Sequence, residues 1–210
     1  MNDREGAELN SVFPPADARN AILEAALSVF ADAGFHGATT RNIAQAAGVS
    51  QPLLHHHFGG KGALWRLVGE RTASDFLTHM FETVDLTLPP EAGVRAMLRA
   101  YLDYWRTHPK AFRFSFWRLQ DGPAAERLAR ADAVTQHGVL FIQRAQAAGY
   151  IRPDIPPGLV LMTCGGAIQF WLRSQLEVRE ALAITGDQDL NDDAFLDHLL
   201  SLMRVRGVPR

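Results

Sequence analysis

The 210-residue sequence predicts an all-α fold in which a small N-terminal three-helix domain precedes a larger helical domain. Apolar residues recur at helical spacing through most of the chain. Hydroxyl residues, glycines and prolines divide this pattern into helix-length segments, because they favour helix starts or stops. No two strand-like runs are placed to pair as a hairpin, and no glycine-rich phosphate loop follows a strand. We expect a flexible arm at residues 1–15, a first domain at 16–62 and a second at 63–210.

The composition is that of a soluble globular protein, with 47% hydrophobic and 21% charged residues. A formal net charge of −2 argues against indiscriminate binding to polyanions, so any contact with nucleic acid must be local. The single cysteine excludes an intrachain disulfide and fits a reducing cytoplasm. The charged N-terminus is unlike a signal peptide, and no apolar stretch is long enough to span a bilayer. We therefore expect a cytoplasmic protein that does not contact a membrane.

Three helices are expected in residues 16–62. The first covers about residues 17–33 and ends before a glycine, which is a helix stop signal. From Thr39 onward, two short helices are separated by a tight turn at Gly48, and a hydroxyl residue precedes each of them. On the second of these, Leu54 and the phenylalanine four positions later face inward. Two short helices with such a turn and a polar outer face make a helix-turn-helix.

Six further helices are expected in the rest of the chain. They cover about residues 61–81, 92–107, 110–120, 124–148, 158–182 and 192–204. Segment 110–120 alternates like a strand around Phe112, Phe114 and Phe116, and so short an alternation does not separate a strand from a buried helix. We choose a helix because no second strand-like run exists to pair with it, and a lone strand is not stable.

A series of short motifs runs without a gap through about residues 17–65. The motifs are Ile22-Leu23-Glu24-Ala25-Ala26-Leu27, Phe30-Ala31-Asp32-Ala33-Gly34-Phe35, Thr39-Thr40, Ile43-Ala44, Ala47-Gly48-Val49-Ser50 and His57-Phe58-Gly59-Gly60-Lys61-Gly62-Ala63-Leu64. Together they resemble the N-terminal domain of TetR/AcrR-type transcriptional regulators. The sequence departs from the family at His55, where a tyrosine is usual, and at Gly62, where glutamate is common. The resemblance implies a helix-turn-helix that binds DNA and a C-terminal domain that binds an effector and dimerises.

The outer face of the second short helix carries side chains that can read bases. Gln51 is suited to the N6 and N7 atoms of adenine, and Leu53 offers an apolar surface to a thymine methyl group. His55 and His56 can donate to a phosphate or to a guanine edge. Hydroxyl and cationic side chains nearby are the expected phosphate contacts. The predicted DNA-binding residues are Thr39, Thr40, Arg41, Ser50, Gln51, Pro52, Leu53, His55, His56 and Lys61.

The charge of this region is unusually even for a DNA-binding surface. Between residues 17 and 62, three bases are balanced by three acids, and the second short helix has no Arg or Lys. Hydroxyl and amide contacts must then carry much of the positioning, with histidine protonation adding positive charge at lower pH. Helix-turn-helix shapes also occur in proteins that bind no DNA. The length of the family resemblance favours DNA binding.

Three adjacent histidines, His55, His56 and His57, raise the possibility of a metal site. Successive residues on a helix point about 100° apart, so these imidazoles do not converge on one ion. We therefore expect no metal and no cofactor.

Aromatic residues gather in the second half of the chain. A packed core accounts for most of them, but large rings from separate helices can also enclose an apolar cavity with a few polar groups. The family resemblance implies such a site for a small-molecule effector. The predicted effector-binding residues are Trp105, Phe112, Phe116, Trp117, His137, Phe141, Cys164, Ile168 and Trp171. Gln169 and Arg173 are further polar candidates, with a subunit interface as the alternative place for Arg173.

Gly165-Gly166 lies inside a strongly apolar helix, where each glycine costs about 1 kcal/mol relative to alanine. That cost suggests the close approach of another helix or of a ligand. The two C-terminal helices are too apolar for a single buried face, which argues for a subunit interface as well as a core. A two-fold dimer would present two recognition helices to a pseudo-palindromic operator.

The sequence thus predicts a DNA-binding transcriptional regulator, most simply a repressor released from a palindromic operator by a small, largely apolar or aromatic ligand. One alternative is a helical protein-interaction module without DNA binding. The other is an enzyme in which Cys164 acts as nucleophile with His137 or His198. Cys164 lies in mid-helix among apolar residues, where the pKa of a thiol rises and its reactivity falls. We therefore expect no catalytic residue.

Overall fold

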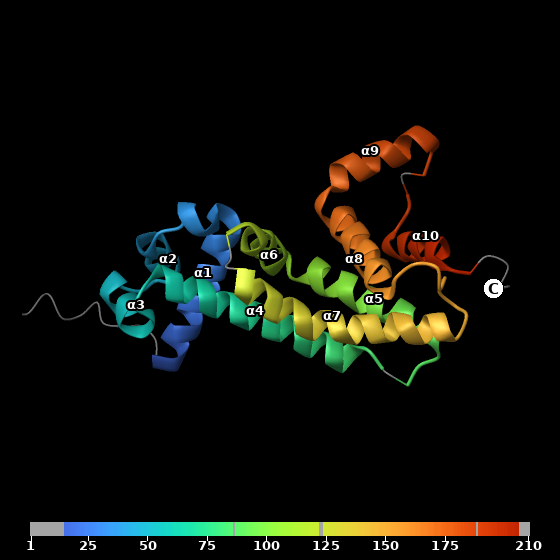
Figure 1. The fold of residues 1–210 in the computed structure, drawn as a ribbon. Helices are drawn as coiled ribbons and strands as arrows, with labels where there is room; N and C mark the ends of the chain where they lie inside the picture. The colour runs from blue at the N-terminus through green and yellow to red at the C-terminus, as the bar shows by residue number, and fades with distance from the viewer. Residues whose placement is uncertain (1–14, 86, 122–123, 188, 206–210) are drawn as a thin grey trace, which may run out of the picture. The chain divides into compact units, whose positions relative to one another are not determined.

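The computed structural model describes residues 15–85, 87–121, 124–187 and 189–205. Residues 1–14 of the predicted N-terminal arm therefore lie outside the described residues. Within these ranges the regular secondary structure is helical (Figure 1). One isolated β-bridge joins Ile151 to Arg204 there. The helices are α1 (Pro15–Gly37), α2 (Thr40–Ala46), α3 (Gln51–Phe58), α4 (Lys61–Thr83), α5 (Pro90–Thr107), α6 (Pro109–Asp121), α7 (Ala124–Ala147), α8 (Pro157–Arg173), α9 (Gln175–Thr185) and α10 (Asp192–Met203). In the described part of the chain, none combines the length and apolarity needed to cross a bilayer.

The helices pack into two compact units. The N-terminal unit comprises the described residues within Met1–Asp75 and His108–Arg127, and the C-terminal unit those within Phe76–Thr107 and Leu128–Arg210. Three aromatic side chains pack together in the N-terminal core. The centroid of the Trp65 ring lies 4.9 Å from the centroids of both the Phe30 and the Phe114 ring. These rings come from α1, α4 and α6, so helices far apart in the sequence share one apolar interior.

Helix α6 belongs by packing to the N-terminal unit, although the sequence suggested residues 63–210 as one domain. Phe114 of α6 is buried in the N-terminal core, and the Trp117 indole Nε1 donates to the Ala31 carbonyl at 3.2 Å. Spacing along α6 predicts an apolar face but not which helix covers it, and here α1 does. The boundary between a DNA-binding and an effector-binding domain near residue 62 stays a prediction. The boundaries between the two packing units lie elsewhere, because α6 packs in the N-terminal unit.

Most helix boundaries follow the predicted stop signals. Gly34 interrupts α1 with φ 65° and ψ −173°, which confirms the expected stop there, and a last helical turn follows it. Segment 110–120 is helical, as predicted. The single helix expected over 158–182 was wrong: it is two helices, because Ser174 leaves the helical conformation with φ −107° and ψ 46°. Serine side chains compete for nearby backbone groups, so they weaken a helix interior without giving a glycine or proline signal.

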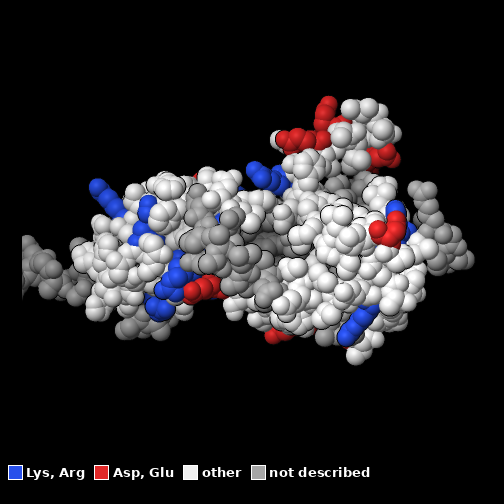
Figure 2. Space-filling view, in the orientation of Figure 1, with Lys and Arg blue, Asp and Glu red and all other residues white. Residues whose placement is uncertain are grey.

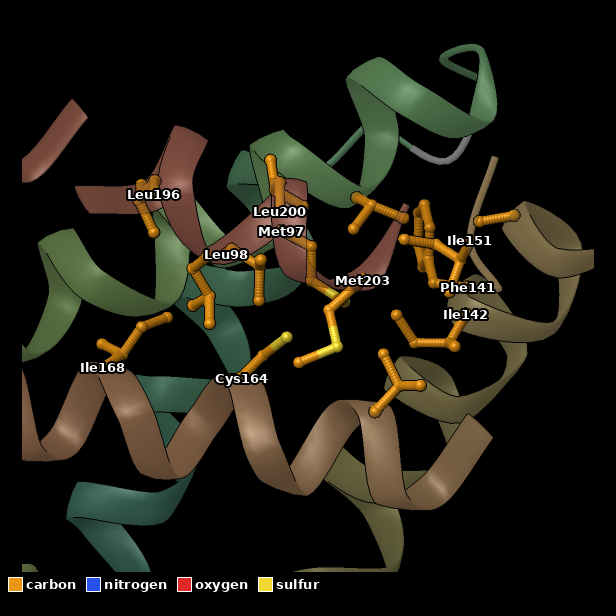
Figure 3. Packing of buried hydrophobic residues seen from close by; sticks show 14 of the residues in the cluster. Met97, Leu98, Phe141, Ile142, Ile151, Cys164, Ile168, Leu196, Leu200 and Met203 are labelled. Atoms are coloured by element: carbon orange, nitrogen blue, oxygen red, sulfur yellow. The ribbon is translucent and has the colours of Figure 1, made fainter. Parts of the chain in front are cut away.

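The C-terminal core lies among α5, α7, α8 and α10 (Figure 3). Met97 and Leu98 of α5 meet Cys164 and Ile168 of α8 there. Exposed ion pairs also join α5 to α10: Asp193 lies 3.1 Å from Arg95 and 3.0 Å from Arg99. Because exposed pairs contribute little, burial of the apolar side chains holds these helices together.

Candidate nucleic-acid interface

Helices α2 and α3 form the predicted helix-turn-helix (Figure 1). Thr39 caps α2, its Oγ1 accepting from the Asn42 amide at 3.1 Å, and Ser50 caps α3, its Oγ accepting from the Leu53 amide at 3.3 Å. Gly48 takes φ 66° in the turn between the helices, a conformation that costs glycine nothing. The two caps and the turn are therefore confirmed as predicted from local sequence.

The two faces of α3 are separated as the sequence indicated. Leu54 and Phe58 are buried with Ile43 of α2, and they anchor α3 to the N-terminal core. The exposed residues of α3 are Gln51, Pro52, His55 and His56, while Leu53 and His57 are half-buried. The outward side chains are thus available to a partner, although their contact with DNA stays a prediction.

Two of the outward side chains are already oriented by the protein. The Gln51 Nε2 donates to the Thr40 Oγ1 at 2.9 Å, which links the first residue of α3 to the first residue of α2. The His55 Nδ1 lies 3.3 Å from the carbonyl oxygen of Gly59, so a proton on Nδ1 is donated there and Nε2 is left outward. Sequence reasoning chose these residues but missed their partners.

Lys61 has a structural task beside its predicted contact with phosphate. Its Nζ donates to the carbonyl oxygens of Phe35 at 2.8 Å and Ala38 at 2.9 Å, and it lies 4.5 Å from the Phe35 ring centroid. Carbonyls at the end of a helix attract cations, which explains the arrangement. An ammonium group has three donor hydrogens, so one remains for an anion.

The positive charge of the N-terminal unit is dispersed. Arg41 is exposed next to Thr40, but α3 itself carries no Lys or Arg. In the view of Figure 2, basic side chains over the N-terminal helices form separate patches with uncharged surface between them. The surface therefore fits a partner recognised by hydrogen bonds and shape, with a modest ionic contribution.

The predicted effector-binding residues fall into both compact units. Phe112, Phe116 and Trp117 belong to the N-terminal unit, where the Phe112 and Phe116 rings pack edge to face with centroids 4.9 Å apart. The six assigned to the C-terminal unit are Trp105, His137, Phe141, Cys164, Ile168 and Trp171. Within the part of the chain that the structure describes, the nine are not members of one compact unit, and their role in effector binding stays a prediction.

In the C-terminal unit most of these side chains contribute to the core. Phe141, Cys164 and Ile168 are buried in it (Figure 3). Trp171 is buried too, with its ring stacked 4.5 Å from that of Phe195 and its Nε1 donating to Asp192 at 2.7 Å. The sequence left open whether these side chains pack in the core or line a pocket. In this structure they pack in the core.

The remaining two effector candidates of the C-terminal unit make aromatic contacts. Trp105 stacks on Phe76 with ring centroids 5.2 Å apart. His137 is exposed on α7, and its ring lies 4.9 Å from that of Phe81. Neither residue is held in the centre of the core, so both retain surface that a ligand could contact.

A polar pair lies at the edge of the same core. The Gln169 Nε2 donates to the Tyr101 hydroxyl at 2.7 Å. Burial raises the pKa of Tyr101, and the hydrogen bond from Gln169 opposes that shift. Gln169 was a sequence candidate for a polar group in a pocket, whereas its partner Tyr101 was not. No pattern in the sequence could have paired residues so far apart.

Cys164 does not have the surroundings of a nucleophile. It is 1% exposed, and burial raises the pKa of its thiol to about 11. A nucleophilic cysteine needs a lowered pKa, from a cation or a helix N-terminus. Among the described residues, the structure has no group of His, Cys, Asp and Glu side chains arranged to hold a metal ion.

Comparisons with known proteins agree with this geometry. Residues 22–68 match the model of bacterial regulatory proteins of the tetR family, and residues 96–193 match a tetracyclin repressor-like C-terminal domain. The HTH-type transcriptional activator FasR of Mycolicibacterium smegmatis is 27% identical, over 82% of this chain and 80% of that protein. The HTH-type transcriptional repressor SCO4008 of Streptomyces coelicolor is 27% identical, over 90% and 95% respectively.

Two further likenesses concern sequence and fold. The HTH-type transcriptional regulator RutR of Escherichia coli is 34% identical, over 69% of both chains. The crystal structure of a TetR-like transcriptional regulator from Rhodococcus sp. RHA1 has a TM-score of 0.70 and 22% identity, over 90% of this chain and 95% of that one. The helical arrangement is therefore one that occurs in known regulators.

Proposed function

This chain belongs to the tetR family of bacterial regulatory proteins, and we propose that it is a repressor that leaves a palindromic operator when a small, largely apolar or aromatic ligand binds. That it is a DNA-binding transcriptional regulator follows from its family and relatives. The observation that carries the proposal is the exposed outer face of α3, a helix that is capped by Ser50 and anchored by its buried inner face.

In this proposal α3 enters the major groove. Gln51 reads an adenine and Leu53 contacts a thymine methyl group, while Arg41 and the helix starts contact phosphates. Because fixed charge on α3 is absent, specific hydrogen bonds supply much of the affinity. Binding should therefore depend less steeply on salt than it does for a surface with many lysines and arginines.

We propose that the functional unit is a homodimer joined through α8. Leu159, Met162 and Phe170 are exposed by 56%, 56% and 59%, and with Gly166 they follow one stripe of the helix. A Cβ on Gly166 would meet nothing within 4 Å, so a second helix can approach there closely. A continuous exposed apolar stripe is typical of a protein interface.

The effector would bind in the C-terminal unit, where rings and a few polar groups lie together. The Tyr101–Gln169 hydrogen bond offers a donor and an acceptor beside Trp105 and Phe76. A ligand that binds one arrangement of the dimer better than another shifts the population toward it. Release from DNA then requires that the favoured arrangement no longer match the spacing of the two half-sites. Activation is the second candidate, favoured by the similarity to the activator FasR.

The test begins with selection of bound sequences from random double-stranded DNA by the full-length protein. We expect a palindromic consensus, bound more tightly than either half-site alone. Gln51→Ala should weaken binding to the consensus by about fivefold or more, because a bidentate base contact contributes about 1–3 kcal/mol of discrimination. The matched control is Gln143→Ala, at an exposed position of α7. Absence of any enriched sequence would contradict the proposed function.

The response to ligand needs a separate measurement. A library of small aromatic and apolar compounds is added to the protein bound to its consensus, and fluorescence anisotropy follows release of the labelled DNA. A compound that releases it supports induction. A compound that instead tightens binding would point to corepression, and transcription assays with the same DNA would separate repression from activation.

A further inference from the structure

The first residues of α2 and α3 are joined by one side-chain hydrogen bond. The Gln51 Nε2 donates to the Thr40 Oγ1 at 2.9 Å, across eleven positions of sequence. The neighbouring hydroxyls have other tasks, because Thr39 and Ser50 each cap the helix that follows them. Of these three hydroxyls, Thr40 is thus the one that holds a side chain of the recognition helix.

The bond leaves a defined set of groups on the Gln51 amide. A glutamine amide has two N–H donors and one carbonyl acceptor. One N–H is given to Thr40, so the carbonyl oxygen and the other N–H remain for a ligand. In the major groove adenine presents an N6 donor and an N7 acceptor, which this remaining pair matches. A bidentate contact to adenine uses the carbonyl oxygen and the N–H on the same side of the amide, so it is compatible with the Thr40 contact when Thr40 accepts from the other N–H.

The bond also restricts the amide. A free glutamine can rotate its amide and exchange the places of donor and acceptor. Thr40 is β-branched, so its hydroxyl has few rotamers, and it lies half-buried at the start of a capped helix. When Thr40 holds the amide, the Gln51 carbonyl oxygen and the second N–H keep fixed positions and do not exchange places. Less side-chain freedom is then lost on binding DNA, since part of it is lost in the free protein.

We propose that Thr40 is a positioning residue for base recognition, which orients the Gln51 amide toward a single adenine of the operator. The inference rests on the proposed function, in which α3 lies in the major groove. It assigns Thr40 a task different from the phosphate contact suggested by the sequence. A phosphate contact supports binding to every sequence equally, whereas a positioning contact supports one base over the others.

The experiment uses the full-length protein and the consensus DNA obtained by selection. The position read by Gln51 is the one whose base preference is lost in Gln51→Ala. Affinities are then measured for the four bases at that position, and for 7-deazaadenine, which lacks the N7 acceptor. The variants are Thr40→Val, which keeps the shape and removes the hydroxyl, and Thr40→Ser, which keeps the hydroxyl. Thr83→Val, at an exposed site on α4, is the matched control. Circular dichroism verifies that each variant is folded.

Thr40→Val is expected to reduce the preference for adenine by about threefold to tenfold, the range of one net hydrogen bond. Thr40→Ser should keep the preference within about twofold, and Thr83→Val should not change it. Thr40→Val should reduce the preference no further when Gln51→Ala is already present, because the two side chains act through one contact. The 7-deazaadenine substitution should weaken the wild type more than it weakens Gln51→Ala.

Three results would overturn the inference. One is an equal loss of affinity for all four bases in Thr40→Val, as expected for a phosphate contact or for general destabilisation. Another is an unchanged adenine preference in Thr40→Val together with its loss in Gln51→Ala. In both cases the proposed function survives, because specific DNA binding is still observed. If the wild type enriches no sequence, the proposed function and the inference fall together.

Discussion

At the scale of single residues, Lys61 connects the start of α4 to the C-terminal end of α1 through hydrogen bonds. Its ammonium donates to two backbone carbonyls and lies over the Phe35 ring. Lys61→Met should therefore lower the free energy of unfolding by about 1–3 kcal/mol, because hydrogen bonds from charged donors are the stronger ones. Urea denaturation followed by circular dichroism measures this. Lys110→Met removes the same charge from an exposed site of the N-terminal unit and should change the free energy by less than about 0.5 kcal/mol.

Equal stability of Lys61→Met and the wild type would show that these contacts contribute nothing in solution. Lys61 would then be a free cation, and the phosphate contact suggested by the sequence would be its main task.

Cys164 should be unreactive in the native protein. Burial raises the pKa of its thiol to about 11 from an ordinary value of 9.0, so deprotonation requires a higher pH than for a free thiol. At pH 8 its thiolate fraction is about a hundredfold lower than that of an exposed cysteine, before access is considered. Alkylation by iodoacetamide, followed by mass spectrometry, should be slow in buffer and fast in urea. Fast alkylation of the folded protein would reopen the catalytic interpretation of Cys164.

At the scale of elements, the contact of α6 with α1 depends on a glycine. A Cβ on Gly34 would lie 2.8 Å from the Trp117 ring, and its φ of 65° with ψ of −173° is open only to glycine. Gly34→Ala should lower the free energy of unfolding by about 2–4 kcal/mol, measured by urea denaturation. Gly48→Ala has a similar φ and no atom within 4 Å, so it should cost about 1 kcal/mol. In the double variant Gly34→Ala with Trp117→Leu, the smaller side chain should relieve part of the destabilisation caused by Gly34→Ala. If the free-energy changes of the two substitutions are fully additive, the Cβ of residue 34 does not clash with the Trp117 ring.

The elements that the sequence predicts best are those with local signals. Thr39, Gly48 and Ser50 mark the two helices of the helix-turn-helix within a few residues, and the structure agrees. The break at Ser174 has no glycine or proline to announce it, and its flanks are continuously apolar. The missed contacts of Lys61 and Thr40 join residues many positions apart, and helical periodicity carries no information about such pairs.

At the scale of the whole molecule, the proposed homodimer would cover the exposed stripe of Leu159, Met162 and Phe170 on α8. Met162→Glu should therefore give a monomer in analytical ultracentrifugation, because a buried charge without a partner is strongly unfavourable. Binding to the palindrome should weaken toward that of one half-site.

The control for this variant is Gln143→Glu, which adds the same charge at an exposed site on α7. If Met162→Glu sediments as the wild type does, α8 is not the interface. A monomeric wild type that still binds the palindrome would contradict the dimer itself.

The membership of α6 in the N-terminal unit bears on how such regulators could be recombined. The chain passes between the two units at residues 75/76, 107/108 and 127/128. A chimera that joins residues 1–75 of this chain to the C-terminal part of another regulator would keep α2 and α3. The residues at the positions of Phe114 and Trp117 would then come from the other regulator. Swapping specificities cleanly would therefore require grafting two separate gene segments, with the aromatic faces of both drawn from one parent.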